Sequence, residues 1–465
     1  MNIFFDETST KLGRDYLRGI CEKLKLVNKV ITLKVPNSDS FNSKDVEVLN
    51  IDLEDTITSN YPELEQIEPF DKGVFNSLNY DSLFTLKMME RFGSFKGEDN
   101  FEKRTKMFFN HVKFWNYMIE SHKIEIAIFL SVPHEPAPFI IYQLMKSKGR
   151  LTLYHEQLAF QDTYTLEDKI KLSKPTSFKK DDLIFKNIKF TIEEFSQKDF
   201  VPFYSKNYFI NQKKIDLKVK KIKRILVEIT HKNHLLKYFF YRIRKFFLKK
   251  RILNFLKKYQ VSPDFDKKYI LIPLHYQPEA STSPKGDIFV YQSLMIQMIS
   301  NSLKDTDWLI YVKEHPAQSP TFGRNLSFYK EINNLNNVFL LNKNLDTKKV
   351  LIESNAVGIV TGTMGLEAII HQIPVLCFGD IYYKFFHGVF PIDSNQQLSE
   401  AIEKIKNGFK PNKEKLINEL EKIPSTYYHG YVNYEYEKVT KISYIQNIKY
   451  LVNNLNNYLL NQNVF

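Results

Sequence analysis

The sequence predicts an α/β protein built from two doubly wound domains. Strand-like and helix-like segments alternate in both halves of the chain, a pattern typical of parallel sheets covered by helices. The 465 residues exceed what one hydrophobic core usually serves. A strongly basic segment separates the two alternating halves. We therefore expect one domain at residues 1–210, a basic amphipathic helical connector at 211–262, and a second domain with terminal helices at 263–465.

The first half opens with a βαβ unit. A helix is predicted over Thr10–Leu26, because Leu12, Tyr16, Ile20 and Leu24 recur on one face, and strands are predicted over Asn2–Phe5 and Lys29–Val35. Residues 36–100 are less regular. Further along we expect a helix at Phe101–Ser121, a buried parallel strand at Ile124–Val132, a helix at Ala137–Lys148 and a strand at Leu151–Tyr154.

Two polar clusters follow the strands of this half. Pro133-His134-Glu135-Pro136 ends one strand, and His155-Glu156-Gln157 follows the next. Ligands of open α/β sheets bind at the carboxyl ends of the strands, so both clusters are candidates for a site. Glu156 is the first candidate for a catalytic carboxylate, followed by His134 and Glu135, and His155 is a candidate for the wall of an acceptor site.

Structural interpretations of the same clusters stay open. Pro136 can start a helix whose dipole Glu135 merely complements, and His155 with Glu156 can be a solvated loop pair.

The second half repeats the alternation. Residues from about 395 onward are expected to be helical. Before them we expect strands at Lys268–Tyr276, Trp308–Lys313 and Val338–Asn342, with helices at Ile288–Leu303 and Asp346–Ser354.

The segment 357–379 predicts a strand, a glycine-threonine loop, a helix from about Leu366 and a second strand. Gly362 and Gly365 allow close approach of the backbone to a ligand, and Thr361 and Thr363 supply hydroxyl groups. The start of the helix adds N–H groups and the positive end of its dipole. This loop is therefore predicted to hold phosphate.

Two other loops carry polar groups suited to an activated sugar. The first contains Gln277 and Glu279, and the second is Lys313-Glu-His315-Pro316. Lys313 places positive charge near a leaving phosphate, and His315 can contact a phosphate or a base. Glu367 can accept hydrogen bonds from a ribose or sugar hydroxyl, although it can equally complement the helix dipole, and His315 can be a buried, satisfied histidine.

The positive charge of the protein is concentrated in one segment. Residues 213–258 hold 17 Lys and Arg and the two acidic residues Asp216 and Glu228. The positive charge of this segment therefore exceeds the net charge of +13 of the whole chain. Aromatic and aliphatic residues interleave with these bases, as in an amphipathic helix on an anionic membrane surface. A linker helix that packs its aromatic face on a domain is an equal alternative. Nucleic acid is not expected as a partner, because no nucleic-acid motif accompanies the segment.

The remaining composition narrows the class of protein. The chain begins without a basic region followed by an apolar one, and it has no run of about 18 uncharged apolar residues, so we expect a cytoplasmic protein, peripheral to the inner membrane face if the basic segment binds lipid. Cys21 and Cys377 lie in apolar patterns that suit buried thiols in a reducing compartment. Two cysteines exclude a structural cysteine zinc site.

Together these motifs resemble the capsule polysaccharide biosynthesis proteins, a family that includes bacterial β-Kdo transferases. The resemblance is carried by the following segments, in this order: Pro133–Pro136, Glu156–Glu167, Gln277–Glu279, Lys313–Pro316, and Thr361–Gly379 with Tyr382-Tyr383. It implies a GT-B glycosyltransferase whose two Rossmann-like domains face each other across a cleft. It also implies a CMP-activated acidic sugar such as Kdo as donor, a surface glycan or glycolipid as acceptor, and no required metal or cofactor.

The chain departs from the family in its first donor loop. Gln277-Pro-Glu279-Ala-Ser stands where Kdo-transferring members have a more acidic Gln-x-Glu-Asp-Asp-Ser run. Another CMP-nonulosonate or another nucleotide sugar therefore stays open as the donor. Two other functions also stay open: a sugar-nucleotide epimerase of the same architecture, and a non-catalytic surface-glycan assembly protein.

Overall fold

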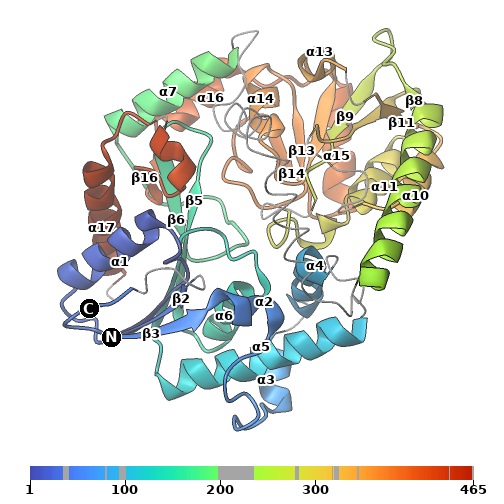
Figure 1. The fold of residues 1–465 in the computed structure, drawn as a ribbon. Coiled ribbons are helices and arrows are strands. Elements are labelled where there is room, and N and C mark those ends of the chain that lie inside the picture. The colour runs from blue at the N-terminus through green and yellow to red at the C-terminus, as the bar shows by residue number, and fades with distance from the viewer. Residues whose placement is uncertain are drawn as a thin grey trace. The chain divides into compact units, whose positions relative to one another are not determined.

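The computed structural model describes residues 1–34, 41–78, 81–93, 101–196, 235–277, 282–316, 318, 324–342, 345–438 and 440–462. The contacts of the chain divide it into two compact units, which are described separately (Figure 1). Unit 1 comprises Met1–Phe92, Asp99–Thr191 and Leu420–Phe465, and unit 2 includes Ile192–Glu419. Of the residues predicted to be functional, Glu279 and the basic residues 213–234 lie outside the described ranges.

Unit 1 contains a seven-stranded sheet among its described residues, in the order β16-β6-β5-β4-β1-β2-β3. The five strands from β5 to β3 are parallel, and β6 and β16 add to the β5 edge in antiparallel pairing. The strands are β1 (Asn2–Phe5), β2 (Lys29–Lys34), β3 (Glu47–Asp52), β4 (Ile126–Phe129), β5 (Leu151–Gln157), β6 (Thr163–Glu167) and β16 (Tyr427–His429). A separate two-stranded ribbon pairs β7 (Phe178–Lys179) with β15 (Ile423–Pro424).

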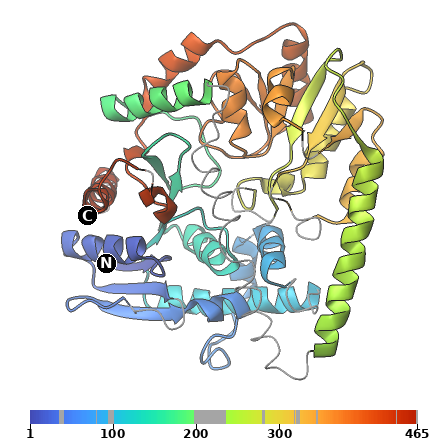
Figure 2. The ribbon, with the colours of Figure 1, turned by 45° about the horizontal axis from the view of Figure 1, so that its top comes forward.

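The helices of unit 1 cover this sheet. Helix α17 lies against α1 in both views, and Tyr444 Oη of α17 donates a hydrogen bond of 2.8 Å to Asp15 Oδ2 of α1 (Figures 1 and 2). The end of the chain therefore packs in the first unit. The helices are α1 (Lys11–Lys23), α2 (Leu53–Thr58), α3 (Lys72–Ser77), α4 (Asp81–Gly93), α5 (Phe101–Ser121), α6 (Pro136–Ser147), α7 (Asp182–Ser196) and α17 (Tyr444–Asn461), with the 3-10 turn η3 (Tyr434–Lys438).

Unit 2 contains a second seven-stranded sheet among its described residues, in the order β14-β13-β12-β9-β10-β11-β8. Every described pair in it is parallel. The strands are β8 (Gln260–Val261), β9 (Tyr269–Pro273), β10 (Leu309–Lys313), β11 (Val338–Leu341), β12 (Ala356–Ile359), β13 (Val375–Cys377) and β14 (Val389–Pro391). The helices are α10 (Leu235–Tyr259), α11 (Gln292–Ser302), α12 (Leu326–Asn333), α13 (Thr347–Ile352), α14 (Met364–Ile370), α15 (Asn395–Lys406) and α16 (Lys413–Leu420), with the 3-10 turn η2 (Asp287–Val290).

Both sheets are doubly wound, as the alternation predicted. In unit 1 the chain runs from β1 through β2 to β3 on one side and then returns to β4 and β5 on the other. In unit 2 it runs from β9 to β11 on one side and from β12 to β14 on the other. Each sheet therefore has a switch point, between β1 and β4 in unit 1 and between β9 and β12 in unit 2, where ligands of such folds bind.

The region 36–100, expected to be less regular, contains the strand β3. Two local predictions were wrong. The region after residue 395 is not purely helical, since Tyr427–His429 forms β16 and pairs with β6. His155, Glu156 and Gln157 do not follow β5 but belong to it, because their backbone pairs with Leu166, Thr165 and Tyr164 of β6.

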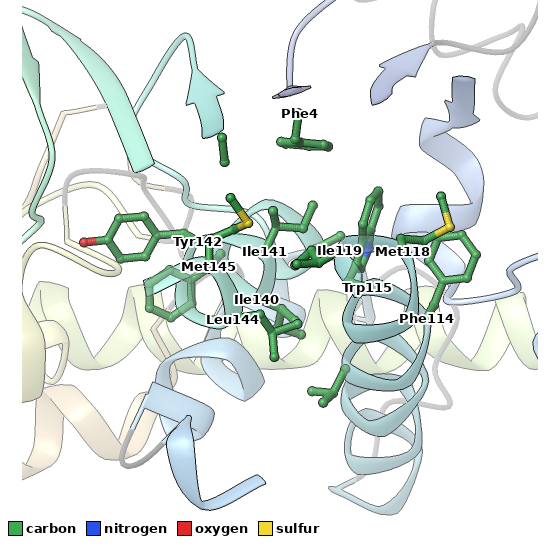
Figure 3. Close-up of a cluster of buried hydrophobic side chains, with 14 of the residues drawn as sticks. Phe4, Phe114, Trp115, Met118, Ile119, Ile140, Ile141, Tyr142, Leu144 and Met145 are labelled. Carbon is green, nitrogen blue, oxygen red and sulfur yellow. The ribbon is translucent and has the colours of Figure 1, made fainter. Parts of the chain in front are cut away.

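The core of unit 1 lies between its sheet and the helices α5 and α6. Figure 3 shows side chains of α5 and α6 turned toward each other beneath Phe4 of β1. Trp115 is fully buried in this cluster, and its Nε1 donates a hydrogen bond of 2.9 Å to Tyr61 Oη. Trp308 lies in the separate core of unit 2, so each unit holds one of the two tryptophans of the chain.

This distribution gives a test of the unit 1 core. In a Trp308→Phe background, Trp115 fluorescence alone reports unfolding of unit 1. We expect Ile141→Ala to lower the free energy of unfolding by about 2–5 kcal/mol, because it leaves a cavity in a fully buried cluster. Leu83→Ala, at a position that is 62% exposed, is the control and should change it by less than about 0.5 kcal/mol. Equal effects of the two changes in urea unfolding would contradict the assignment of this core.

Candidate functional site

The three predicted donor loops of unit 2 follow β9, β10 and β12, at the carboxyl edge of the parallel sheet. Strand β9 leads into His275 and Gln277, β10 ends at Lys313, and β12 leads into Thr361 and Gly362. Since parallel strands all end at one edge, the three loops start side by side. Whether these residues contact a ligand stays a prediction.

A buried arginine joins the first two loops. Arg324 Nη1 donates to Glu314 Oε1 at 2.8 Å and to Gln318 Oε1 at 3.1 Å. Its Nη2 donates to the carbonyl oxygen of His275 and to Gln292 Oε1. The remaining oxygen of Glu314 accepts a hydrogen bond from Tyr329 Oη. A guanidinium has its donors in a fixed fork, so this pattern fixes the relative positions of the elements that supply the acceptors.

Gln277 and Gln318 add a second link between the same loops. Gln318 Oε1 accepts from the Gln277 amide at 2.8 Å, and Gln318 Nε2 donates back to the Gln277 carbonyl at 3.1 Å. Gln277 Nε2 donates to Thr282 Oγ1 at 3.0 Å. The Gln277 side chain, predicted to bind donor, is 5% exposed and holds its own loop together.

His275 joins the first loop to the glycine-threonine loop, across the switch point of the sheet. Its Nε2 accepts a hydrogen bond of 2.9 Å from the Thr361 amide. Burial, followed by the charge of Arg324, lowers the pKa of His275 to about 3, so the ring is neutral and Nδ1 carries the proton. The amide of Thr361 therefore points at a protein acceptor.

The glycines of the third loop fit against protein atoms. A Cβ on Gly362 would lie 3.0 Å from His275 Nε2, and a Cβ on Gly365 would lie 2.5 Å from Tyr383 Oη. Tyr383 Oη donates to the Gly362 carbonyl and is itself fully buried. Thr361 is buried, Gly362 is partly exposed and Thr363 is exposed. The ligand-accessible part of this loop is therefore its Gly362–Thr363 corner.

The other predicted donor residues differ in burial. Lys313 is 3% exposed, whereas His315 is half-buried and Pro316 is exposed. The His315 ring lies edge-on to Tyr276, with centroids 5.7 Å apart. Glu367 lies in the first turn of α14, and burial raises the pKa of its carboxyl, an effect that Lys348 partly offsets.

In unit 1, His134 and Glu135 line a cavity of about 200 Å³. The cavity lies beyond the carboxyl ends of β1, β2 and β4, at the switch point of the sheet. His134 Nδ1 donates to the Val132 carbonyl at 2.7 Å, which leaves Nε2 as the basic nitrogen of the neutral ring. Glu156, by contrast, lies half-buried in β5 and does not line this cavity.

Asp6 also lines this cavity, and sequence reasoning missed it. It follows β1 directly, and its Oδ1 accepts a hydrogen bond of 2.9 Å from the Leu130 amide after β4. Burial, followed by the charge of Glu7, raises the pKa of Asp6 well above its usual value, and Glu135 adds to this effect. No motif marks this residue, because a single Asp after a strand is common.

His155 is a structural residue in this arrangement. It is fully buried, its Nδ1 donates to the Phe129 carbonyl at 2.8 Å, and its Nε2 lies 3.1 Å from Tyr16 Oη. Burial lowers its pKa to about 4. Both cysteines are free thiols, with Cys377 buried and Cys21 partly buried. Within the described ranges, no three His, Cys, Asp or Glu side chains gather as metal ligands would.

The family model of capsule polysaccharide biosynthesis proteins matches residues 194–404. This match confirms the predicted resemblance over a range that contains all three donor loops. No curated protein matches the sequence.

Among solved structures, the chain is similar to the β-Kdo 2,7 transferase KpsC of Thermosulfurimonas dismutans, with 10% identity, 97% of this chain and 99% of that chain covered, and a TM-score of 0.34. It is also similar to the UDP-GlcNAc 2-epimerase of Methanocaldococcus jannaschii, with 11% identity, coverage of 90% and 98%, and a TM-score of 0.28. A third similar structure is the lipopolysaccharide outer core galactosyltransferase WaaB, with 9% identity, coverage of 99% and 100%, and a TM-score of 0.29.

The hydrogen bond between His275 and Thr361 gives a test of the loop geometry. In a Trp115→Phe background, Trp308 fluorescence reports unfolding of unit 2. We expect His275→Leu to cost about 1–3 kcal/mol at pH 7, because the buried Thr361 amide loses its acceptor.

The cost should depend on pH in a defined direction. The folded-state pKa of His275 is lowered, so only the unfolded chain binds its proton between pH 6.5 and about 3, and wild type loses stability as pH falls through this window. At pH 5 the advantage of wild type over His275→Leu should therefore shrink by about 2 kcal/mol. A difference in unfolding free energy that is the same at pH 7 and pH 5 would show that His275 is not buried in its neutral form.

Proposed function

We propose that the protein is a glycosyltransferase of the GT-B type. It transfers a sugar, Kdo or another CMP-activated acidic sugar, from a nucleotide donor to a growing capsule or surface polysaccharide or glycolipid. The observation that carries this proposal is the convergence of the three donor loops at one sheet edge, within the range that matches the capsule family. A metal or cofactor is not part of the proposed reaction.

Unit 2 supplies the donor side of this proposal. Lys313 and His315 come from the end of β10, and the Gly362–Thr363 corner comes from the end of β12, on the other side of β9. This arrangement suits a phosphate group held by several loops at once. Negative charge that develops on the leaving phosphate is stabilised by a cation that is already in place. Lys313 is such a cation, because its burial restricts where its ammonium can lie.

Nucleotide binding separates the proposed donor from the alternatives. We expect CMP to stabilise the protein against heat by about 2.7 kcal/mol at a hundredfold excess over its dissociation constant, and UDP and GDP to have little effect. Lys313→Met should abolish this stabilisation. Lys330→Met, an exposed lysine of α12, is the matched control and should retain it. Stabilisation by UDP instead of CMP would redirect the proposal toward a UDP-sugar enzyme such as an epimerase.

The surface of α10 supports a second part of the proposal, contact with an anionic membrane. One side of the helix packs on the core of unit 2, through Leu248, Ile252, Phe255 and Leu256. The other side keeps Phe246 at 63% and Phe247 at 58% exposure, among the exposed bases Lys249, Lys250 and Arg251. In the linker alternative, the aromatic face of the helix packs on a domain. Such packing explains the buried side of α10 but not the exposed rings on its other side. Among the described helices, none combines the length and the hydropathy that a membrane-spanning segment needs.

Vesicle flotation tests this contact. The protein should float with vesicles that contain about one third phosphatidylglycerol, less so at high salt, and should not float with pure phosphatidylcholine. Phe246→Ser with Phe247→Ser should weaken binding about tenfold or more, because two exposed rings no longer enter the interface. Phe101→Ser, a ring of similar exposure in α5, is the control. Lipid-independent behaviour would support the linker alternative.

A further inference from the structure

The cavity of unit 1 differs in its charge from the phosphate sites expected in such folds. Its charged lining comprises Asp6, Glu7, Glu135 and one lysine, Lys34. The Lys34 ammonium lies 3.4 Å from Asp52 Oδ1, so its charge is already paired. The cavity is therefore acidic, and it disfavours an anionic phosphate or nucleotide.

The helix that begins at the cavity also lacks the usual donors for an anion. Helix α6 starts at Pro136, and its third residue is Pro138, so neither position has an N–H group. The Phe139 amide donates to the Glu135 carbonyl. Only the Ala137 amide remains at this end without an intrahelical acceptor, which is too little for a phosphate cradle.

The Asp6 carboxyl is enclosed by protein but keeps part of its surface in the cavity. Its Oδ1 accepts from the Leu130 amide, and the described residues offer Oδ2 no donor from a neighbouring residue. It also forms no ion pair with a described residue. Glu7 is occupied differently, since its Oε1 accepts from the Ser9 amide, the Ser9 hydroxyl and the Thr10 amide at the start of α1. The loop after β1 is thus fixed, and Asp6 is its carboxyl that lines the cavity and is not used to hold the start of α1.

We propose that this cavity binds a sugar unit of the acceptor and that Asp6 accepts the proton of the acceptor hydroxyl. This inference rests on the proposed function and gives it an acceptor subsite in unit 1. The volume of about 200 Å³ is below that of pockets for drug-sized ligands and suits one ring. Carboxylate oxygens accept hydrogen bonds from hydroxyl groups, so an acidic cavity selects a neutral polyol over the charged donor.

The proton step balances without a further reactant. The acceptor oxygen forms a bond to the anomeric carbon of the donor, and the bond between that carbon and the phosphate oxygen breaks. The phosphate leaves with the electron pair, and Asp6 Oδ2 takes the hydroxyl proton, which later passes to solvent. His134 and Glu135 also line the cavity, where they orient the sugar. The charge of Glu135 in addition keeps the proton affinity of Asp6 high.

The first test measures binding of the acceptor in the cavity, without any donor present. The probe is the glycolipid extracted from a strain that lacks the protein, added to the full chain and followed by microscale thermophoresis. Ser131→Trp places a large ring in the cavity from an exposed loop position and should weaken binding at least about tenfold, whereas Asp6→Asn should bind within about threefold of wild type. Absence of binding by wild type, or unchanged binding by Ser131→Trp, would overturn the subsite.

The second test measures the role of Asp6. With CMP-Kdo as donor and the same extract as acceptor, Asp6→Asn should lower kcat by about 10²–10⁴-fold and leave the affinity for CMP unchanged. Asp45→Asn, an exposed carboxylate of the same unit, is the control and should keep the wild-type rate. A rate of Asp6→Asn within about twofold of wild type would overturn the assignment. If wild type transfers nothing from CMP-Kdo and does not bind CMP, the proposed donor fails, and the binding test still decides the subsite.

A third readout tests Asp6 without any ligand. Because its folded-state pKa is raised, Asp6 favours folding in its protonated form, and this contribution is lost as pH rises above about 4. Asparagine resembles the protonated carboxyl. Near pH 4, Asp6→Asn should therefore have the same melting temperature as wild type, and near pH 8 a higher one. The melting temperature of Asp45→Asn should equal that of wild type at both pH values. Equal melting of Asp6→Asn and wild type near pH 8 would contradict an enclosed carboxyl.

Discussion

The arrangement of unit 2 depends on the burial of the Arg324 guanidinium. An ion of this size costs several kcal/mol to remove from water, so it is stable only where nearly all its donors find acceptors. Glu314, Gln318, Gln292 and the His275 carbonyl meet this requirement. They come from the loops after β9 and β10 and from the start of α11, which are therefore fixed before any ligand binds. Through the ring of His275 the same constraint reaches the loop after β12.

The two units carry different charged groups at the same topological position, the switch point of the sheet. At the switch point of unit 2, a neutral histidine and a buried lysine accompany a loop with an exposed Gly362–Thr363 corner. At the switch point of unit 1, Asp6 and Glu135 make the cavity acidic, and two prolines remove helix N–H groups. Under the proposed function, the side chains at the strand ends would thus adapt similar backbones to an anionic donor in one unit and a neutral acceptor in the other.

Local pattern predicted the apolar parallel strands β1, β2, β4, β5 and β9 to β13, because buried parallel strands are apolar runs, and it predicted many of their helices from a repeat of three to four residues. It missed β3, β6, β8, β14 and β16. It failed where tertiary pairing decides. His155 and Glu156 are polar, yet they lie in β5 because β6 pairs with them. Arg324 and Asp6 were missed for a related reason: each is one common residue, and its role arises from partners such as Glu314 or Leu130 that other loops supply. Their importance is visible only when the loops are brought together.

The glycine-threonine loop follows β12, as predicted, and most of its groups contact protein atoms. Gly365 has no room for a side chain because Tyr383 Oη lies where its Cβ would be, and that hydroxyl in turn binds the Gly362 carbonyl. The Thr361 amide is turned toward His275. Most of the motif therefore maintains the turn itself, in the short helix α14 and its flanks. Under the proposed function, ligand contact would fall to the exposed Thr363 and to groups from the loops after β9 and β10, so affinity should depend on the relative position of three loops more than on this sequence alone.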